Sequence, residues 1–209
     1  MQNKQLWLDL MRKFGPILAA IIIMFFVSRV HADYEAGLDA VFKGDYQTAL
    51  REFTIAAEDG LDVAQFNLAN LYYFGRGVDQ DLEQAFKWTE AAAQQGHLGA
   101  QANLGSLLLD GSGTVRDVDK GMEWIGAAGR GGHAPSTISM AKMYFDGSPV
   151  DRDYVLAHVW ASMAKLYEHE EAADLLRRIE RRMDSDEMSQ ARRLYARWQI
   201  EPVTLPSNN

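Results

Sequence analysis

The sequence repeats itself with a period of 36 residues over three consecutive copies. Residues 64–77 align with residues 100–113 and again with residues 136–149, and no insertion or deletion is needed. The register continues at the positions Asp81/Asp117/Asp153, Ala85/Gly121/Ala157, Trp88/Trp124/Trp160, Ala92/Ala128/Ala164 and His97/His133/His169. A fixed period of about 20–50 residues is typical of a solenoid, in which each unit buries its apolar face against its neighbours. The sequence therefore predicts a stacked repeat array.

Each copy has the pattern of a helical hairpin. Apolar residues such as Ala64, Leu68 and Leu71 recur at spacings of three and four, which predicts one face of a first helix. Gly75 is expected to end that helix because glycine accepts a left-handed backbone, and Asp81 is placed to cap the second helix. Trp88 and several alanines would then face the neighbouring hairpins.

The repeated residues resemble the Sel1-like repeat family, whose units are tetratricopeptide-like hairpins, over about residues 62–169. The third copy departs from the family pattern at Pro149 and Glu168, where glycines belong, and we expect its last helix to run straight into the following helices. The resemblance implies an all-α protein, an α/α solenoid. It also implies that the first helix of each hairpin lines the concave surface.

Further helices are expected on both sides of the repeats. The turn at Gly44-Asp45-Tyr46 resembles a tetratricopeptide unit, and Ser185 is expected to cap the last of two closing helices. The predicted units are residues 1–32 (signal peptide or uncleaved anchor), 33–61 (tetratricopeptide-like hairpin), 62–97, 98–133 and 134–169 (Sel1-like repeats), 170–199 (capping helices) and 200–209 (flexible tail).

The first 32 residues have the layout of a bacterial secretory signal peptide. Lys4, Arg12 and Lys13 precede an apolar run of 14 residues, 14–27, and small residues follow at Val30-His31-Ala32. The run is shorter than the roughly 17–25 residues of a spanning helix, which favours cleavage after Ala32 and a periplasmic or secreted protein. The long basic region and Arg29 keep the alternative of an uncleaved inner-membrane anchor open.

Charge and composition exclude several classes of protein. After removal of residues 1–32 the chain would carry 17 basic and 28 acidic residues, which argues against binding to nucleic acid. The sequence contains no cysteine, so disulfides, thiol catalysis and attachment of a lipid to an N-terminal cysteine are excluded.

The residues that could carry chemistry have structural interpretations. His97, His133 and His169 recur at the hairpin junctions, about 10 Å apart if each lies on its own repeat, which is too far for one metal ion. The recurring Asp-x-Asp pairs lack the remaining ligands of a calcium loop. No serine lies in a Gly-x-Ser-x-Gly motif. We therefore expect no metal, no cofactor and no catalytic residue.

Arginines are concentrated in the closing helices, and two interpretations remain open. The residues are Arg177, Arg178, Arg181, Arg182, Arg192, Arg193 and Arg197. Acidic residues lie within helical reach of them, which favours a salt-bridged, solvated face. The alternative is a basic patch for an anionic partner.

A binding surface is predicted on the first helices of the hairpins, from the faces that the core leaves unused. Its residues are Phe66, Asn70, Tyr73 and Phe74 in the first Sel1-like unit, Ser106, Leu109 and Asp110 in the second, and Ile138, Lys142, Phe145 and Asp146 in the third. The groove would be aromatic at its N-terminal end and more polar further on. Exposed aromatic residues in a concavity are typical of binding hot spots. The alternative is that some of them, Phe74 especially, pack between hairpins.

These observations predict a non-enzymatic scaffold or adaptor in the bacterial envelope that binds a protein or peptide on its concave face. A binder of a small ligand or of a cell-wall or polysaccharide fragment is the alternative. A membrane partner is expected only if the N-terminal segment is retained.

Overall fold

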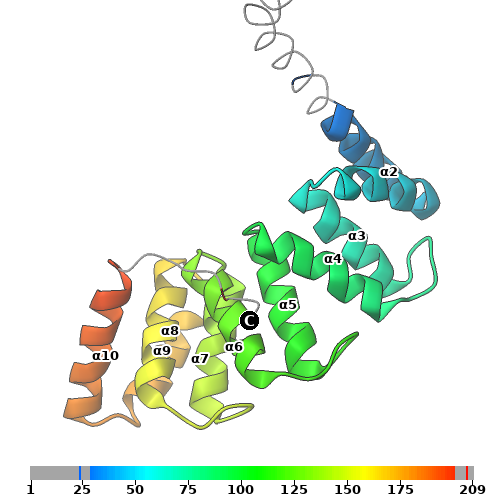
Figure 1. The fold of residues 1–209 in the computed structure, drawn as a ribbon. Coiled ribbons are helices and arrows are strands. Elements are labelled where there is room, and N and C mark those ends of the chain that lie inside the picture. The colour runs from blue at the N-terminus through cyan, green and yellow to red at the C-terminus, as the bar shows by residue number, and fades with distance from the viewer. Residues whose placement is uncertain (1–23, 25–28, 201–205, 207–209) are drawn as a thin grey trace, which may run out of the picture.

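The computed structural model describes residues 24, 29–200 and 206. Most of the predicted signal segment 1–32, and the tail apart from residues 200 and 206, lie outside these described residues. The described part is all-α, which confirms the predicted fold class. Its helices lie side by side in a curved row that runs from the helical stretch 29–42 to α10 (Figure 1). In that part, no helix combines the length and the apolar character that crossing a membrane requires.

The helices follow one another as hairpins. They are the stretch 29–42 and then α2 (Tyr46–Glu58), α3 (Asp62–Phe74), α4 (Leu82–Gln94), α5 (Leu98–Asp110), α6 (Val118–Arg130), α7 (Ala134–Asp146), α8 (Tyr154–Leu166), α9 (Ala172–Glu180) and α10 (Ser185–Trp198). The three aligned copies form α3/α4, α5/α6 and α7/α8, and every one of these helices has 13 residues. The equal lengths follow from a repeat without insertions.

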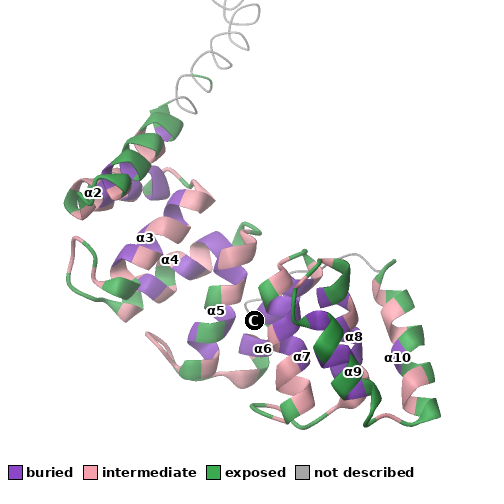
Figure 2. Cartoon of the chain, turned by 180° about the vertical axis from the view of Figure 1, so that it is seen from behind, coloured by how far each residue is buried: buried purple, intermediate pink, exposed green. Residues whose placement is uncertain are grey.

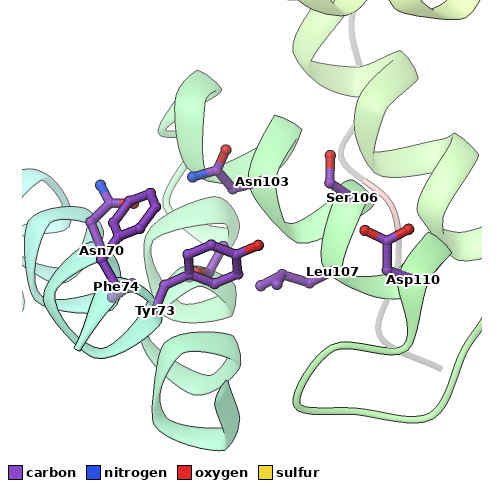
Figure 3. Close-up of a pocket in the computed structure, with 9 residues that line it drawn as sticks. Asn70, Tyr73, Phe74, Asn103, Ser106, Leu107 and Asp110 are labelled. Atoms are coloured by element: carbon purple, nitrogen blue, oxygen red, sulfur yellow. The ribbon is translucent and has the colours of Figure 1, made fainter. Parts of the chain in front are cut away.

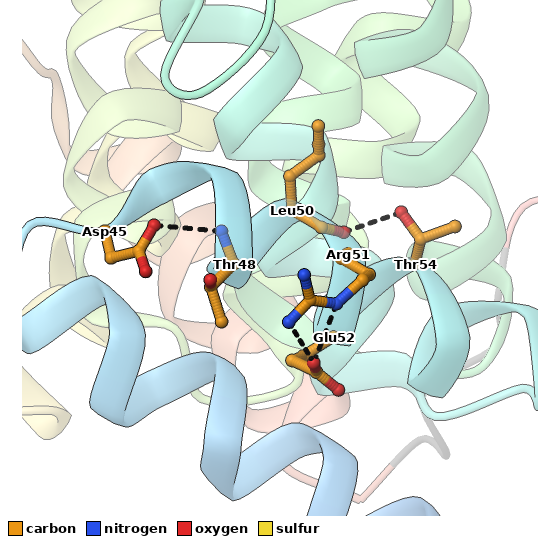
Figure 4. Close-up of polar contacts among 6 residues, drawn as sticks. All are labelled: Asp45, Thr48, Leu50, Arg51, Glu52 and Thr54. Carbon is orange, nitrogen blue, oxygen red and sulfur yellow. Dashed lines mark hydrogen bonds and ion pairs between the residues drawn. The ribbon is translucent and has the colours of Figure 1, made fainter.

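Aspartate caps begin the second helix of each hairpin. The side chains of Asp81, Asp117 and Asp153 accept hydrogen bonds from backbone N–H groups three residues later, at 3.0, 3.0 and 2.8 Å. The predicted cap at Asp81 is thus confirmed. Asp45 does the same for α2, where it accepts from the Thr48 N–H at 3.1 Å (Figure 4). The Thr48 side chain and the Thr48 N–H both favour the ionised carboxylate of Asp45, and they hold its pKa below the ordinary value.

The cap of α10 differs from the predicted one. Asp184 caps the helix, because its carboxylate accepts from the N–H groups of Asp186 and Glu187, while the Glu187 side chain accepts from the Asp184 N–H. Ser185 is the first helical residue instead. Aspartate and serine are similarly good caps, and the reciprocal bond from the third helical residue decides in favour of Asp184.

Small residues at the contacts between helices allow the hairpins to stack closely. Alanines such as Ala64, Ala92 and Ala128 are fully buried, and Trp160, in the C-terminal part of the core, is 2% exposed. Figure 2 shows the buried residues on the sides of the helices that face their neighbours. Gln65 and Gln101 add a polar contact, because each amide donates to a carbonyl of the preceding helix, Ala57 at 3.1 Å and Ala93 at 3.3 Å.

The third hairpin closes with a turn, and the prediction that it runs straight into the next helix is wrong. Glu168 has φ 57°, the left-handed conformation that Gly60, Gly96 and Gly132 adopt at the ends of the earlier hairpins. The repeat geometry therefore imposes the turn on a residue that lacks glycine's freedom. α9 begins four residues later, at Ala172.

The two closing helices pack against α8. Trp198 of α10 meets Trp160 edge to face, with ring centroids 4.9 Å apart. His158 of α8 is buried; its Nε2 lies 3.5 Å from the Glu180 carboxylate of α9 and its Nδ1 lies 3.4 Å from the Ser162 hydroxyl. Burial, together with Arg192, lowers the pKa of His158, and Glu180 offsets only part of that shift.

Replacement of Gly113 by alanine is expected to destabilise the protein strongly. A Cβ at Gly113 would overlap the carbonyl oxygen of Leu82 in the preceding hairpin, and the residue has φ 71°. The expected loss is about 2–4 kcal/mol of unfolding free energy, measured by chemical denaturation. Gly96→Ala is the matched control, because φ is 93° there but nothing lies within 4 Å of the Cβ, and its loss should be about 1 kcal/mol. Equal losses for the two variants would contradict the close-approach argument.

Acidification is expected to destabilise the C-terminal packing through His158. A pKa below the unfolded value of about 6.5 means that the unfolded chain binds the proton more readily, so the histidine's contribution is present above that pH and is lost as the pH falls. The melting temperature should therefore fall between about pH 7.5 and 5.5, and it should fall less in His158→Gln, which cannot take up the proton. An identical fall in the two proteins would show that His158 does not contribute.

Candidate functional site

A cavity of about 170 Å³ opens between α3 and α5, with α4 contributing to its wall. Its lining consists of Ala69, Asn70, Tyr73, Phe74, Thr89, Asn103, Ser106, Leu107 and Asp110. Tyr73 reaches from α3 toward α5, and Asn103, Ser106 and Asp110 come from α5 (Figure 3). The structure thus brings together five of the residues predicted for the binding surface, which are Asn70, Tyr73, Phe74, Ser106 and Asp110.

Two adjacent aromatic residues form the apolar part of the cavity. Tyr73 is 38% exposed and Phe74 is 58% exposed, and their rings meet edge to face with centroids 5.0 Å apart. The guanidinium of Arg76 lies 5.2 Å from the centroid of the Phe74 ring. Phe74 is therefore at the surface and does not pack between hairpins, which was the alternative for this residue.

The polar part of the cavity has unused hydrogen-bonding capacity. The side chains of Asn70, Asn103 and Asp110 make no hydrogen bond or ion pair within the described part of the chain. Only Ser106 is engaged, through a hydroxyl that donates to the Ala102 carbonyl at 3.1 Å. Two amides and a carboxylate are thus available to a ligand in a site that also offers aromatic surface.

Asn103 and Leu107 line the cavity but are not among the residues that the sequence pattern predicts for it. With Ser106 and Asp110 they form the spacing i, i+3, i+4 and i+7 along α5, which is one face of a helix. That spacing could have identified Asn103. Leu107 could not be identified as a cavity residue because it also fits the pattern of the core, and its side chain is buried. Ala69 and Thr89 are small residues with no comparable signal in the sequence.

Phe66 and Leu109 lie away from the cavity. Phe66 stacks on the His97 ring with centroids 4.5 Å apart and packs against the central part of the core. Leu109 packs against the C-terminal part of the core, where a Cβ on Gly121 would touch it. Both side chains are therefore used for contacts between helices.

The third hairpin does not offer the surface predicted for it. Ile138 is 4% exposed and belongs to the core, so its assignment to the binding surface is corrected. Lys142 pairs with Glu171 at 2.7 Å, and Phe145 is half-buried beneath Arg178 and beside Tyr154. Asp146 remains exposed at the end of α7. The physical reason is that α9 and the residue before it contact α7, which the repeat pattern does not specify.

The recurring histidines have the structural contacts that their position suggests. His97 Nδ1 accepts a hydrogen bond from the Ala100 N–H at 3.1 Å, and His133 Nδ1 lies 2.8 Å from the Ser136 hydroxyl. Burial, with a smaller contribution from His97, lowers the pKa of His133. Among the described residues no group of three or more His, Cys, Asp and Glu side chains could hold a metal ion.

A second, wider cavity of about 510 Å³ lies where α10 meets α6 and α8. Arg130 lies beside the two contacting indole rings there, 5.9 Å from the Trp160 centroid and 5.8 Å from the Trp198 centroid. Burial lowers the pKa of Arg130. Since the guanidinium contacts the indoles of both α8 and α10, these contacts contribute to the docking of the last helix.

Comparison with known proteins identifies the repeats. The Sel1 repeat model matches residues 62–97, 99–133 and 134–165. A crystal structure of a Sel1 repeat protein from Oxalobacter formigenes is similar, with 28% identity and a TM-score of 0.66, over 81% of this chain and 54% of that one. The structure of c5321, a protective antigen present in uropathogenic Escherichia coli strains and displaying an SLR fold, gives 22% identity and a TM-score of 0.41, over 86% of this chain and 50% of that one.

The chain therefore spans about half the length of both solved proteins. No curated protein matches the sequence. Sel1 repeats typically mediate protein–protein interactions, and the proteins that carry them are generally non-enzymatic scaffolds. The matched residues, the helical hairpins and the structural likeness agree, and the chain contains three Sel1 repeats.

Proposed function

We propose that this chain is a non-enzymatic scaffold of the bacterial envelope that binds a segment of a partner protein in the cavity between α3 and α5. The observation that carries the proposal is the combination of exposed Tyr73 and Phe74 with the unpaired Asn70, Asn103 and Asp110 in one concave site. Aromatic side chains contribute most to binding energy when a partner covers them, and unpaired polar groups supply direction.

The size of the cavity favours a protein segment over a small molecule. Sites for small ligands have volumes of roughly 300–1,000 Å³ and enclose most of the ligand. The cavity between α3 and α5 has about 170 Å³, which is room for one side chain of a longer segment. A cell-wall or polysaccharide fragment would need more polar groups converging on one point than this site provides.

The proposed envelope location rests on the N-terminal sequence. The packing around residue 30 favours the alternative in which residues 1–32 are retained as a membrane tether. The helical stretch 29–42 passes through the predicted cleavage site at Ala32 without a break. Val30 is 6% exposed and belongs to the same core cluster as Ala40 and Phe53, and Arg29 Nε lies 3.6 Å from Asp33 Oδ2. Cleavage after Ala32 would remove Val30 from the core of the first hairpin.

Loss of the Tyr73 ring is expected to abolish partner binding without affecting the fold. Tyr73→Ala in the full chain should reduce capture of the native partner from envelope extract by at least tenfold, because an exposed aromatic hot spot contributes about 2 kcal/mol or more to binding. Leu166→Ala is the control, since it removes another exposed apolar side chain, at the end of α8 and outside the cavity. Both variants should keep the wild-type melting temperature. Undiminished capture by Tyr73→Ala would refute the assignment of the site.

Retention of the N-terminal segment is tested on the full chain expressed in a bacterium. The intact mass should correspond to the uncleaved chain, which should sediment with membranes. Val30→Ala should lower the unfolding free energy by about 1–2 kcal/mol, because two methyl groups leave the core, whereas the exposed Glu35→Ala should have little effect. A mature chain that begins at Asp33 in the soluble periplasmic fraction would contradict the tether.

A further inference from the structure

We infer that the cavity between α3 and α5 selects a positively charged side chain, a lysine or an arginine, on the partner segment. This inference rests on the proposed function and specifies the chemistry of the partner.

The electrostatics of the site favour a cation. Asp110 is exposed and unpaired within the described part of the chain, and no lining residue of the cavity is basic. The surrounding units reinforce this sign, because residues 33–97 contain twelve acidic and four basic side chains. An approaching ammonium or guanidinium group is therefore attracted by the nearby carboxylates as well as by Asp110.

The aromatic rings of the cavity are suited to the same charge. A cation over a tyrosine or phenylalanine face is attracted by the negative potential of the ring. The protein already uses this contact at the rim, where the Arg76 guanidinium lies 5.2 Å from the Phe74 centroid and 5.5 Å from the Tyr46 centroid. No cation of the described chain lies over the Tyr73 ring. Tyr73 thus offers an unused aromatic surface beside an unused carboxylate.

The amides complete the site for an extended cationic side chain. Asn70 and Asn103 have free oxygen acceptors for N–H donors, while Ala69 and Leu107 offer apolar contact for the methylene groups of lysine or arginine. An acidic side chain would instead be placed beside Asp110 without a compensating cation, and this repulsion would exclude it. The site thus accepts one sign of charge and rejects the other.

The third hairpin provides an internal comparison. Its counterparts of Tyr73 and Phe74 are Phe145 and Asp146, and the positive charges around Phe145 already belong to the protein, since Arg178 lies 5.0 Å from that ring. Lys142, which corresponds to Ser106, is paired with Glu171. The cationic groups that an external segment would supply between α3 and α5 are thus supplied at α7 by the chain itself.

The test uses short randomised peptides displayed on phage, selected on the immobilised full chain in detergent. Peptides whose capture is lost with Tyr73→Ala define binding in the cavity, and these peptides should be enriched in lysine or arginine. Asp110→Asn, which keeps the size of the side chain, should weaken a selected basic peptide by about tenfold and reduce the salt dependence of its affinity. Asp146→Asn is the matched control, because it changes the carboxylate 36 residues later, outside the cavity, and should change nothing.

The outcomes separate this inference from the proposed function. Peptides that depend on Tyr73 but carry no basic residue, or that bind Asp110→Asn as tightly as the wild type, overturn the inference and leave protein binding in the cavity intact. Recovery of no peptide that depends on Tyr73 overturns both. Enrichment of basic residues together with sensitivity to Asp110→Asn and insensitivity to Asp146→Asn supports both.

Discussion

The close approach of the first two repeated hairpins to the hairpin before each of them is the contact on which the rest of this solenoid depends. Gly113 lies so near the first residues of α4 that a single added carbon would overlap the Leu82 carbonyl, and Gly77 has the same relation to Tyr46 of α2. Two backbones in contact leave no freedom of spacing, unlike side chains that can adjust their rotamers. The equal length of the repeated helices then carries this spacing along the row, and the position of every surface residue follows from it.

That spacing also explains why a cavity exists between α3 and α5. The hairpins are held together through backbone contacts at their loops and through buried alanines and tryptophans between their helices. α3 and α5 carry Tyr73 and Leu107 toward one another, beside the small Ala69 and Thr89, and these side chains do not fill the space. At α7 the corresponding surface is filled, because Glu171 and Arg178 contact it from the following helix. A row of equal units thus has one open site and one that the chain itself occupies.

The sequence predicted the parts of this structure that depend on periodicity. Spacings of three and four gave the hairpins, and the recurring aspartates gave the caps, because both are local properties that repeat in register. Five of the cavity residues followed from the same register. Ile138 did not, because it packs into the C-terminal part of the core, which includes residues of α9, a helix outside the repeats. At Glu168 the error was of the opposite kind. The residue adopts a left-handed backbone although it is not a glycine, so the turn is set by the packing of the hairpin and could not be predicted from the local sequence.

Comparison of the three copies separates structural positions from binding positions. Where a side chain faces a neighbouring hairpin, the copies keep its type, as at Leu68, Leu104 and Met140, which are all buried. Where a side chain faces the open surface, the copies differ in size and charge, as at Asn70, Ser106 and Lys142. A requirement for stacking acts on every copy alike, whereas a partner contacts each copy at a different point of its own surface. The cavity combines an aromatic residue from one copy with a carboxylate from the next, so it is a site that no single repeat could form.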